Sequence, residues 1–174
     1  MKPRTNMIPL LIVDGYNVIG QWSRAVRLGW SIDISRERLA HMLSEYASYE
    51  GLEVVLVFDG AYSERLTRSE EKQGAMTIVF TRQGETADQY IERLADQTPK
   101  RREMRVATSD NVEQTVVLGR GAARVPAREL LRDIEESRKK QSARIGDKTI
   151  KAYPIYQRLP PEQREKLERL RRGK

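Results

Sequence analysis

Cysteine is absent from this chain, and histidine occurs once, as His41. Without cysteine the chain can form neither a disulfide scaffold nor a cysteine-ligated zinc or iron–sulfur site, and one histidine cannot build a His-rich zinc site. A long hydrophobic run is also missing, because the apolar stretch of "MKPRTNMIPLLIV" ends at Asp14. That stretch is too short for a signal-peptide core or a membrane span. We therefore expect a soluble, cytoplasmic protein with no membrane partner.

Charged residues are abundant, but the two signs are unevenly distributed. Residues 1–131 carry 18 basic and 18 acidic side chains, whereas residues 132–174 carry 14 and 7, so the net charge of +7 lies in the last segment. A basic tail beside a neutral body indicates a polyanionic partner such as RNA. The alternative is a solvated helix that only aids solubility. The basic residues of this segment that we expect to contact RNA are Lys139, Lys140, Arg144, Lys148 and Lys151.

Apolar runs alternate with helical patterns over the first two-thirds of the chain. The runs that predict strands are Leu10–Val13, 52–59, 76–81, 104 to Asp110, and Ala122–Val125. The segments that predict helices are 35–49, capped by Asp33 or Ser35 and ended by Gly51, then 85–96, 112–119 and a long helix after Pro126. Strands that alternate with helices imply a mainly parallel sheet covered on both faces, so the expected fold class is α/β.

The remaining segments suggest how the chain is divided. The polar stretch 61–75 is predicted to be a loop or a short helix. We expect one domain over residues 1–138 and a basic C-terminal extension over residues 139–174. The extension would consist of a linker at 146–161 and a short basic helix at the end of the chain.

Aspartates mark the carboxyl ends of the predicted strands. Asp14 and Asp59 end two apolar runs, Asp110 follows another, and Asp88 falls in the first turn of the helix after the third strand. Because ligands bind at the carboxyl ends of parallel strands, near the point where strand order reverses, we expect these acids to share one rim.

Each aspartate could instead be a helix cap or a turn residue. This alternative is weaker for Asp88, because Thr86 and Gln89 have the spacing of a capping box. It is also weaker for Asp14, because "DGYN" is expected to continue as a loop before any helical pattern begins.

Several carboxylates in one crevice repel one another unless a cation neutralises them. Mg²⁺ and Mn²⁺ prefer hard oxygen ligands and keep bound waters, which suits an open rim of aspartates. Asn17 would add an amide that can bind a metal-bound water or a phosphate oxygen, or orient a carboxylate. Gly15 lets the chain turn sharply there. This combination of residues predicts metal-assisted hydrolysis of a phosphodiester.

Four segments in this order resemble the YacP-like group of NYN-domain proteins, a branch of the PIN-like nuclease superfamily: "IVDGYNVIG", "VLVFDGA", "GETADQYIERLA" and "VATSDNVEQ". The resemblance covers Leu10 to Ser137. It implies a PIN-like three-layer α/β/α sandwich with a central, mainly parallel sheet and a Mg²⁺- or Mn²⁺-dependent endoribonuclease. It further implies cleavage of mRNA on the ribosome. Our leading hypothesis is an endoribonuclease that cuts single-stranded RNA.

The resemblance also implies roles for individual residues. The catalytic set it implies is Asp14, Asn17, Asp88 and Asp110. Of these, the three aspartates would be the metal ligands. Asp59 matches a strand-end acid of less defined role, and Glu85 is a possible helper of Asp88.

Other residues could contact RNA. Tyr16 could stack on a base at the mouth of the site, or it could pack under the loop. Arg24 and Arg27 lie between Trp22 and Trp30 and could form an RNA-facing lip, although both tryptophans could equally belong to the core.

Two other functions are compatible with parts of this pattern. One is a non-catalytic RNA- or ribosome-binding module on a nuclease-like fold, against which the complete set of acids argues. The other is a phosphatase with an aspartyl nucleophile, which is disfavoured because Tyr16 stands where a second aspartate would be expected.

Overall fold

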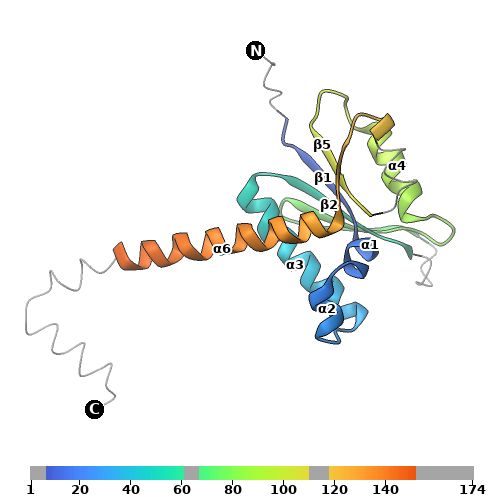
Figure 1. The fold of residues 1–174 in the computed structure, drawn as a ribbon. Helices are drawn as coiled ribbons and strands as arrows, with labels where there is room; N and C mark the ends of the chain where they lie inside the picture. The colour runs from blue at the N-terminus through green and yellow to red at the C-terminus, as the bar shows by residue number, and fades with distance from the viewer. Residues whose placement is uncertain (1–6, 61–66, 110–117, 152–174) are drawn as a thin grey trace, which may run out of the picture. The chain divides into compact units, whose positions relative to one another are not determined.

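The computed structural model describes residues 7–60, 67–109 and 118–151, with side chains described up to residue 145 (Figure 1). Within these residues six strands form one sheet, in the order β3-β4-β2-β1-β5-β6. Neighbouring strands are parallel, apart from the antiparallel pair β3–β4. The strands are β1 (Leu10–Asp14), β2 (Glu53–Phe58), β3 (Ser69–Gln73), β4 (Met76–Phe80), β5 (Met104–Ala107) and β6 (Ala123–Val125). The predicted α/β fold with a mainly parallel sheet is confirmed.

Helices connect most of these strands. They are α1 (Gly15–Gly20), α2 (Ser23–Arg27), α3 (Ile32–Glu50), α4 (Ala87–Gln97) and α6 (Ala127–Lys151). The helix α3 ends as predicted at Gly51, which has the left-handed φ of 67° that glycine adopts readily. Its start was predicted wrongly. Ser31 is the N-cap, because its hydroxyl accepts a hydrogen bond from the Ile34 N–H at 3.2 Å, and Ile34 is exposed, so the first turn shows no apolar pattern.

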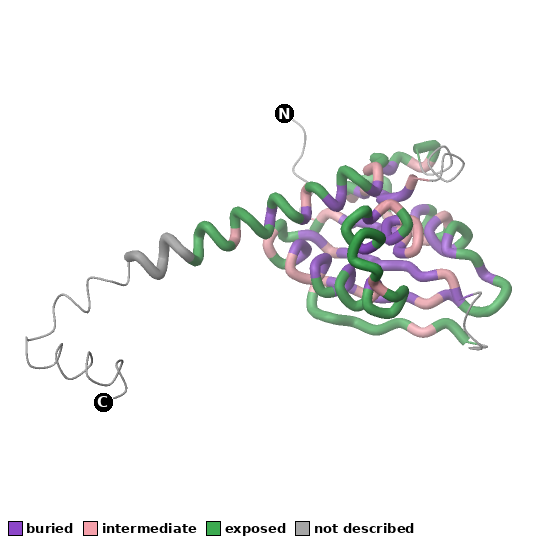
Figure 2. The backbone as a smooth tube through the Cα atoms, turned by 60° about the horizontal axis from the view of Figure 1, so that its bottom comes forward, coloured by how far each residue is buried: buried purple, intermediate pink, exposed green. Residues whose placement is uncertain are grey.

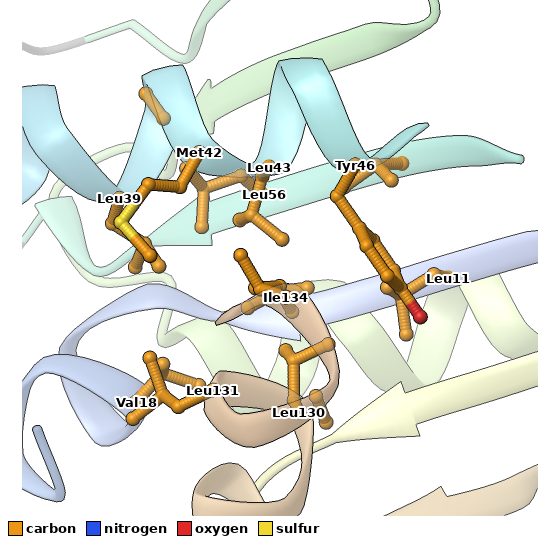
Figure 3. Close-up of a cluster of buried hydrophobic side chains, with 14 of the residues drawn as sticks. Leu11, Val18, Leu39, Met42, Leu43, Tyr46, Leu56, Leu130, Leu131 and Ile134 are labelled. Carbon is orange, nitrogen blue, oxygen red and sulfur yellow. The ribbon is translucent and has the colours of Figure 1, made fainter. Parts of the chain in front are cut away.

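Side chains of the sheet alternate between two faces, and each face is covered by helices. One face carries Leu11, Leu56 and other buried residues, which pack against α1, α3 and the first turns of α6 (Figure 3). The other face carries Ile12 and Val57, which pack against α4. Figure 2 shows that buried residues follow the strands and the inward sides of these helices. The arrangement is a three-layer α/β/α sandwich.

The strand β3 corrects the prediction of a loop or short helix at 61–75. Its sequence, "SEEKQ", is polar throughout and mostly exposed, so no apolar alternation reveals it. It pairs antiparallel with β4 through a turn at Gly74, whose φ is 60°. Charged side chains are typical of an edge strand, where they oppose pairing with another chain.

The C-terminal part of the chain also differs from expectation. The helix α6 continues through Gly146 to Lys151, so the linker predicted to begin at 146 is wrong for residues 146–151. A single glycine costs a helix only about 1 kcal/mol and does not end it. The chain divides into two compact units, residues 1–137 and 138–174. The predicted terminal helix and most of the helix predicted at 112–119 lie outside the described residues.

No helix in the described ranges is long and apolar enough to cross a membrane.

Candidate active site at the carboxyl edge of the sheet

The sheet has its topological switch point beside β1. From β1 the chain passes to β2 on one side, and from β4 it crosses through α4 to β5 on the other side. Val13 of β1 is in register with Ala107 of β5, so the residues that follow these two leave the sheet at the same edge. A crevice between the carboxyl ends of β1 and β5 is where this fold class binds ligands.

Asp14 is the last residue of β1 and is half-buried. Its Oδ1 accepts a hydrogen bond from the backbone N–H of Asn17 at 3.3 Å, which makes Asp14 the N-cap of α1. The expectation that "DGYN" continues as a loop is therefore wrong. A six-residue helix is too short to show a periodic pattern. Capping does not exclude a role in chemistry, since a carboxylate can accept several hydrogen bonds or hold a cation at once.

Asn17 joins the two strands that flank the switch point. Its Oδ1 accepts a hydrogen bond from the backbone N–H of Ser109 at 2.7 Å. Ser109 comes directly before Asp110 in the sequence. Asp110 itself lies outside the described residues. The amide of Asn17 thus ties the turn after β1 to the segment that leads into the predicted late acid.

Two glycines permit close packing at this edge. A Cβ atom at Gly15 would lie 2.3 Å from Cε1 of Phe58, and one at Gly60 would lie 1.6 Å from the carbonyl oxygen of Thr81. Asp59, half-buried, stands between Phe58 and Gly60 at the end of β2. The residues that follow β1, β2 and β4 can therefore pack closely against one another at the carboxyl edge of the sheet.

Asp88 lies in the first turn of α4 and is exposed. The predicted capping box is confirmed: the Gln89 N–H donates to Thr86 Oγ1 at 3.2 Å, and the Thr86 N–H donates to Gln89 Oε1 at 3.1 Å. Thr86 is therefore the cap of α4, so capping does not account for Asp88. Because α4 follows β4, its first turn lies beyond the edge at which β4 ends.

Glu85 is buried and engaged by two arginines. Arg68 Nη2 donates to its carboxylate at 2.7 Å, and Arg93 also donates to it. Both guanidinium groups lie over the ring of Tyr90, at 4.8 and 5.6 Å from its centroid. Burial raises the pKa of Glu85, but the hydrogen bonds from Arg93 and Arg68 outweigh it, so the pKa lies below its usual value. A carboxylate neutralised by two cations is a weak ligand for a third.

The predicted metal ligands have the right chemistry for Mg²⁺ or Mn²⁺, because all of them are carboxylate oxygens. In residues 7–60, 67–109 and 118–151, no group of three or more histidine, cysteine or acidic side chains is arranged to hold a metal. Asp14 and Asp88 belong to this described part and Asp110 does not. The carboxylates of Asp14 and Asp88 therefore have the chemistry that such an ion requires. The third predicted ligand, Asp110, lies outside the described residues.

The predicted RNA-contacting residues differ in their surroundings. Tyr16 packs against Phe58 with its ring centroid at 5.0 Å, and its hydroxyl accepts a hydrogen bond from Arg36 Nη1 at 3.1 Å. No local pattern in the sequence indicates this role for Arg36, which lies 20 residues from Tyr16.

The helix α2 carries Arg24 and Arg27 on its surface, where both are exposed. Trp22 is buried and meets Trp30 edge to face at 5.3 Å, so the core alternative holds for Trp22. Lys139, Lys140 and Arg144 are exposed on α6, whereas Lys148 and Lys151 lie where side chains are not described.

The six-stranded α/β/α sandwich, with acids and an amide near its switch point, has a nuclease-like fold, as its family and structural relatives indicate. The YacP-like NYN domain matches residues 11–172, and the chain belongs to this family. It is 36% identical over 166 residues to the YacP protein of Bacillus subtilis (strain 168), described as uncharacterized, with 94% of this chain and 97% of that protein covered.

Solved structures of a relative show the same fold. The crystal structure of Rae1 (YacP) from Bacillus subtilis matches with a TM-score of 0.70 and 33% identity, covering 95% of this chain and 96% of the other. A single-substitution variant of Rae1 matches with a TM-score of 0.71 and 32% identity, covering 92% and 98%.

Proposed function

We propose that this protein is a metal-dependent endoribonuclease that hydrolyses phosphodiester bonds in single-stranded RNA. The observation that carries the proposal is the hydrogen bond from the Ser109 N–H to Asn17 Oδ1 at 2.7 Å. It fixes the turn that bears Asp14 against the segment that leads into Asp110, at the switch point where this fold class binds its ligands. Membership of the YacP-like NYN family supports the same reaction.

The roles of the acids follow from their positions. Asp14, Asp88 and Asp110 would hold Mg²⁺ or Mn²⁺, and a bound metal would supply an activated water and stabilise charge on the phosphate. Asn17 holds the two strand exits in register. Asp59 is a possible additional donor at the neighbouring exit.

Glu85 lies close to Asp88 in sequence, and its ion pairs with Arg68 and Arg93 support a role in positioning the start of α4. It would act on the reaction through Asp88 without contacting the metal itself.

RNA affinity would come from basic residues outside the acidic rim. Arg24 and Arg27 are exposed on α2, and Lys139, Lys140 and Arg144 are exposed on α6. Lysine and arginine contacts to phosphates provide affinity that does not depend on sequence. The resemblance to ribosome-associated members of the family supports mRNA on the ribosome as the substrate.

The test is a cleavage assay with 5′-labelled unstructured and structured RNA, in Mg²⁺, in Mn²⁺ and in chelator, repeated with translating ribosomes. We expect cleavage of the unstructured RNA that chelator abolishes. Asp14→Asn and Asp88→Asn should each reduce the rate by about 10³-fold or more, since a lost metal ligand removes electrostatic stabilisation of the transition state.

Asp96→Asn is the matched control, because Asp96 is an exposed acid in the last turn of the same helix as Asp88 and pairs with Arg120 at 2.6 Å. Its rate should stay near that of the unmodified protein. An Asp14→Asn, Asp88→Asn double variant that cuts RNA at the unmodified rate would overturn the proposal. Binding of RNA without cleavage under any of these conditions would assign the protein to the non-catalytic class.

A further inference from the structure

A cavity of about 550 Å³ adjoins the candidate active site. The residues that line it in the described part of the chain are Tyr16, Ile32, Asp33 and Arg36. Tyr16 lies on α1, the helix that Asp14 caps, and its ring contacts Phe58, the last residue of β2, so the cavity lies at the carboxyl edge of the sheet. Figure 1 shows α1, α2 and the start of α3 gathered at the end of the sheet where β1 leaves it. A cavity of this volume is within the range that accommodates small organic ligands, including one nucleotide.

Tyr16 and Ile32 form two apolar walls of the cavity, and the ring of Tyr16 is held in place by its contacts. The ring of Tyr16 leans on Phe58, with the ring planes at 55°, and its hydroxyl is bonded to Arg36, so the ring is fixed at both ends. Ile32 contributes the other apolar wall and is 50% exposed, although it is a large hydrophobic residue. Flat bases of single-stranded RNA bind against such aromatic and aliphatic surfaces.

A further wall combines an acceptor with a donor. Asp33 and Arg36 form an ion pair one turn apart on α3, and their side chains are 69% and 31% exposed. A guanidinium carries more N–H donors than its contacts with Tyr16 and Asp33 use, and a carboxylate can accept several hydrogen bonds. The pair can therefore bind a ligand while it stays intact.

We propose that this cavity binds one unstacked guanine base of the RNA, next to the bond that is cut. The proposal rests on the proposed function. Guanine has adjacent N–H donors beside a carbonyl oxygen on its Watson–Crick edge, so Asp33 can accept from the donors while Arg36 donates to the oxygen. Uracil has a single N–H between two carbonyl groups, and adenine and cytosine place their amino group beside a ring acceptor. Guanine is thus the base whose edge matches the pair.

A neighbouring cavity of about 480 Å³ shares Asp33 and Arg36 but is a poor path for RNA. Its lining adds the acids Glu37 and Glu71, and among its described lining residues Arg36 is the only lysine or arginine. A phosphate backbone would be repelled there.

The RNA strand should instead run past α2, where the side chains of Arg24 and Arg27 are exposed. The edge-to-face contact of Trp22 with Trp30 holds that helix against the turn that precedes Ile32.

The inference can be tested without cleavage or ribosomes, by NMR titration of the full chain with each of the four nucleoside 5′-monophosphates and with inorganic phosphate. GMP should shift the backbone amide signals of residues 32–36 and saturate in the millimolar range. AMP, CMP and UMP should bind at least about fivefold more weakly, the lower end of what a bidentate base contact discriminates. Phosphate alone should leave these signals in place.

Substitutions then separate the pocket from its surroundings. Asp33→Asn and Arg36→Ala should each weaken GMP binding at least about fivefold. Glu37→Gln and Arg38→Ala are the matched controls, because Glu37 lines the other cavity and Arg38 lies over Trp30 at 4.3 Å from the ring centroid. Both controls should bind GMP as the unmodified protein does, and thermal unfolding would verify that all four variants are folded.

Equal binding of the four nucleotides, shifts caused by phosphate alone, or GMP affinity unchanged in Asp33→Asn and Arg36→Ala would each overturn the inference. These results are distinguishable from failure of the proposed function. A protein that binds GMP selectively and cuts no RNA would support the guanine pocket and contradict the proposed nuclease function. A protein that cuts RNA and shows no selective GMP binding would support the nuclease function and contradict the guanine pocket.

Discussion

Asn17 and Ser109 are 92 residues apart in the sequence, and the backbone N–H of Ser109 donates a hydrogen bond to Oδ1 of Asn17 at 2.7 Å. This bond directly links the turn after β1 to the segment after β5. The helix α1 begins at this turn because Asp14 accepts the Asn17 N–H. One residue thus couples a helix cap to the geometry of the switch point.

Replacing Asn17 tests whether its hydrogen bond to Ser109 matters more for RNA cleavage than for the stability of the fold. In Asn17→Ala the Ser109 N–H loses its acceptor, which should lower the free energy of unfolding by about 1 kcal/mol. RNA cleavage should fall by about tenfold or more, because small misplacements of catalytic groups are costly. Urea unfolding and single-turnover cleavage measure the two effects.

Asn17→Asp retains an acceptor at this position and is the informative comparison. Asn17→Asp should recover most of the lost free energy of unfolding. It should not recover the rate of RNA cleavage, because a further negative charge beside Asp14 increases the repulsion among the carboxylates of the candidate site. Full activity in Asn17→Ala would show that the link has no part in the reaction.

The buried pairing of Glu85 with Arg68 and Arg93 should make stability depend on pH. Burial disfavours the charge of Glu85, but the two arginines hold its pKa below the usual 4.5. The unfolded chain then binds a proton more readily than the folded one, so the pairing stabilises the protein above the unfolded pKa. That stability is lost as the pH falls through the lower, folded pKa.

Glu85→Gln should therefore lower the free energy of unfolding by about 2 kcal/mol at pH 7, because it removes charge-assisted hydrogen bonds to two arginines. The difference between the two proteins should shrink below a pH of about 4.5, where the carboxyl is half protonated in the unfolded chain. Urea unfolding between pH 3 and 7 would measure it. A difference that stays constant over this range would contradict the account.

Gly60 is predicted to be intolerant of any side chain. The Cβ atom of alanine would lie 1.6 Å from the Thr81 carbonyl oxygen, a backbone atom that cannot rotate away. The Gly60 N–H also donates to Thr81 Oγ1 at 2.8 Å, so movement would break a buried hydrogen bond. Gly60→Ala should destabilise the protein by about 2 kcal/mol or more.

Gly20→Ala is the control for this change, since nothing lies within 4 Å of a Cβ atom at the end of α1. It should be neutral or stabilising by up to about 1 kcal/mol. Differential scanning calorimetry of both variants gives the comparison, and equal melting temperatures would refute the crowding at Gly60.

The elements that could be predicted from the sequence are those whose pattern is local and apolar. The runs at β1, β2 and β4 are apolar, so these strands and the mainly parallel sheet could be predicted from their alternation with helices. The cap at Thr86 could be predicted because Gln89 stands three residues later. The strand β3 could not, because an exposed, charged edge has no apolar alternation to show.

The candidate site divides in the same way. The position of Asp14 could be predicted because an apolar run stops there. The partners of the site residues could not, because they are distant in sequence: Arg68 lies 17 residues from Glu85, and Arg36 lies 20 from Tyr16. Such pairs depend on how the layers pack, which a single sequence does not display.

Exposed basic residues at the start of the C-terminal unit should set the salt dependence of RNA binding. Replacing Lys139, Lys140 and Arg144 by glutamine removes three exposed positive charges. Each phosphate contact to a single strand contributes about 0.7 to the slope of log affinity against log salt, so the slope should fall by about 2. Affinity at low salt should fall in parallel for all sequences, because phosphate contacts do not read bases.

The control for this variant replaces three exposed cations elsewhere, Lys72, Lys100 and Arg101. Lys72 lies on β3 at the far edge of the sheet, and the other two lie before the amino end of β5, opposite the candidate site. Fluorescence anisotropy with a labelled single-stranded RNA at several salt concentrations would compare the two variants. The control should keep the slope of the unmodified protein. If both variants lowered the slope equally, the attraction would arise from total charge, and the basic segment after residue 138 would have no specific place in RNA binding.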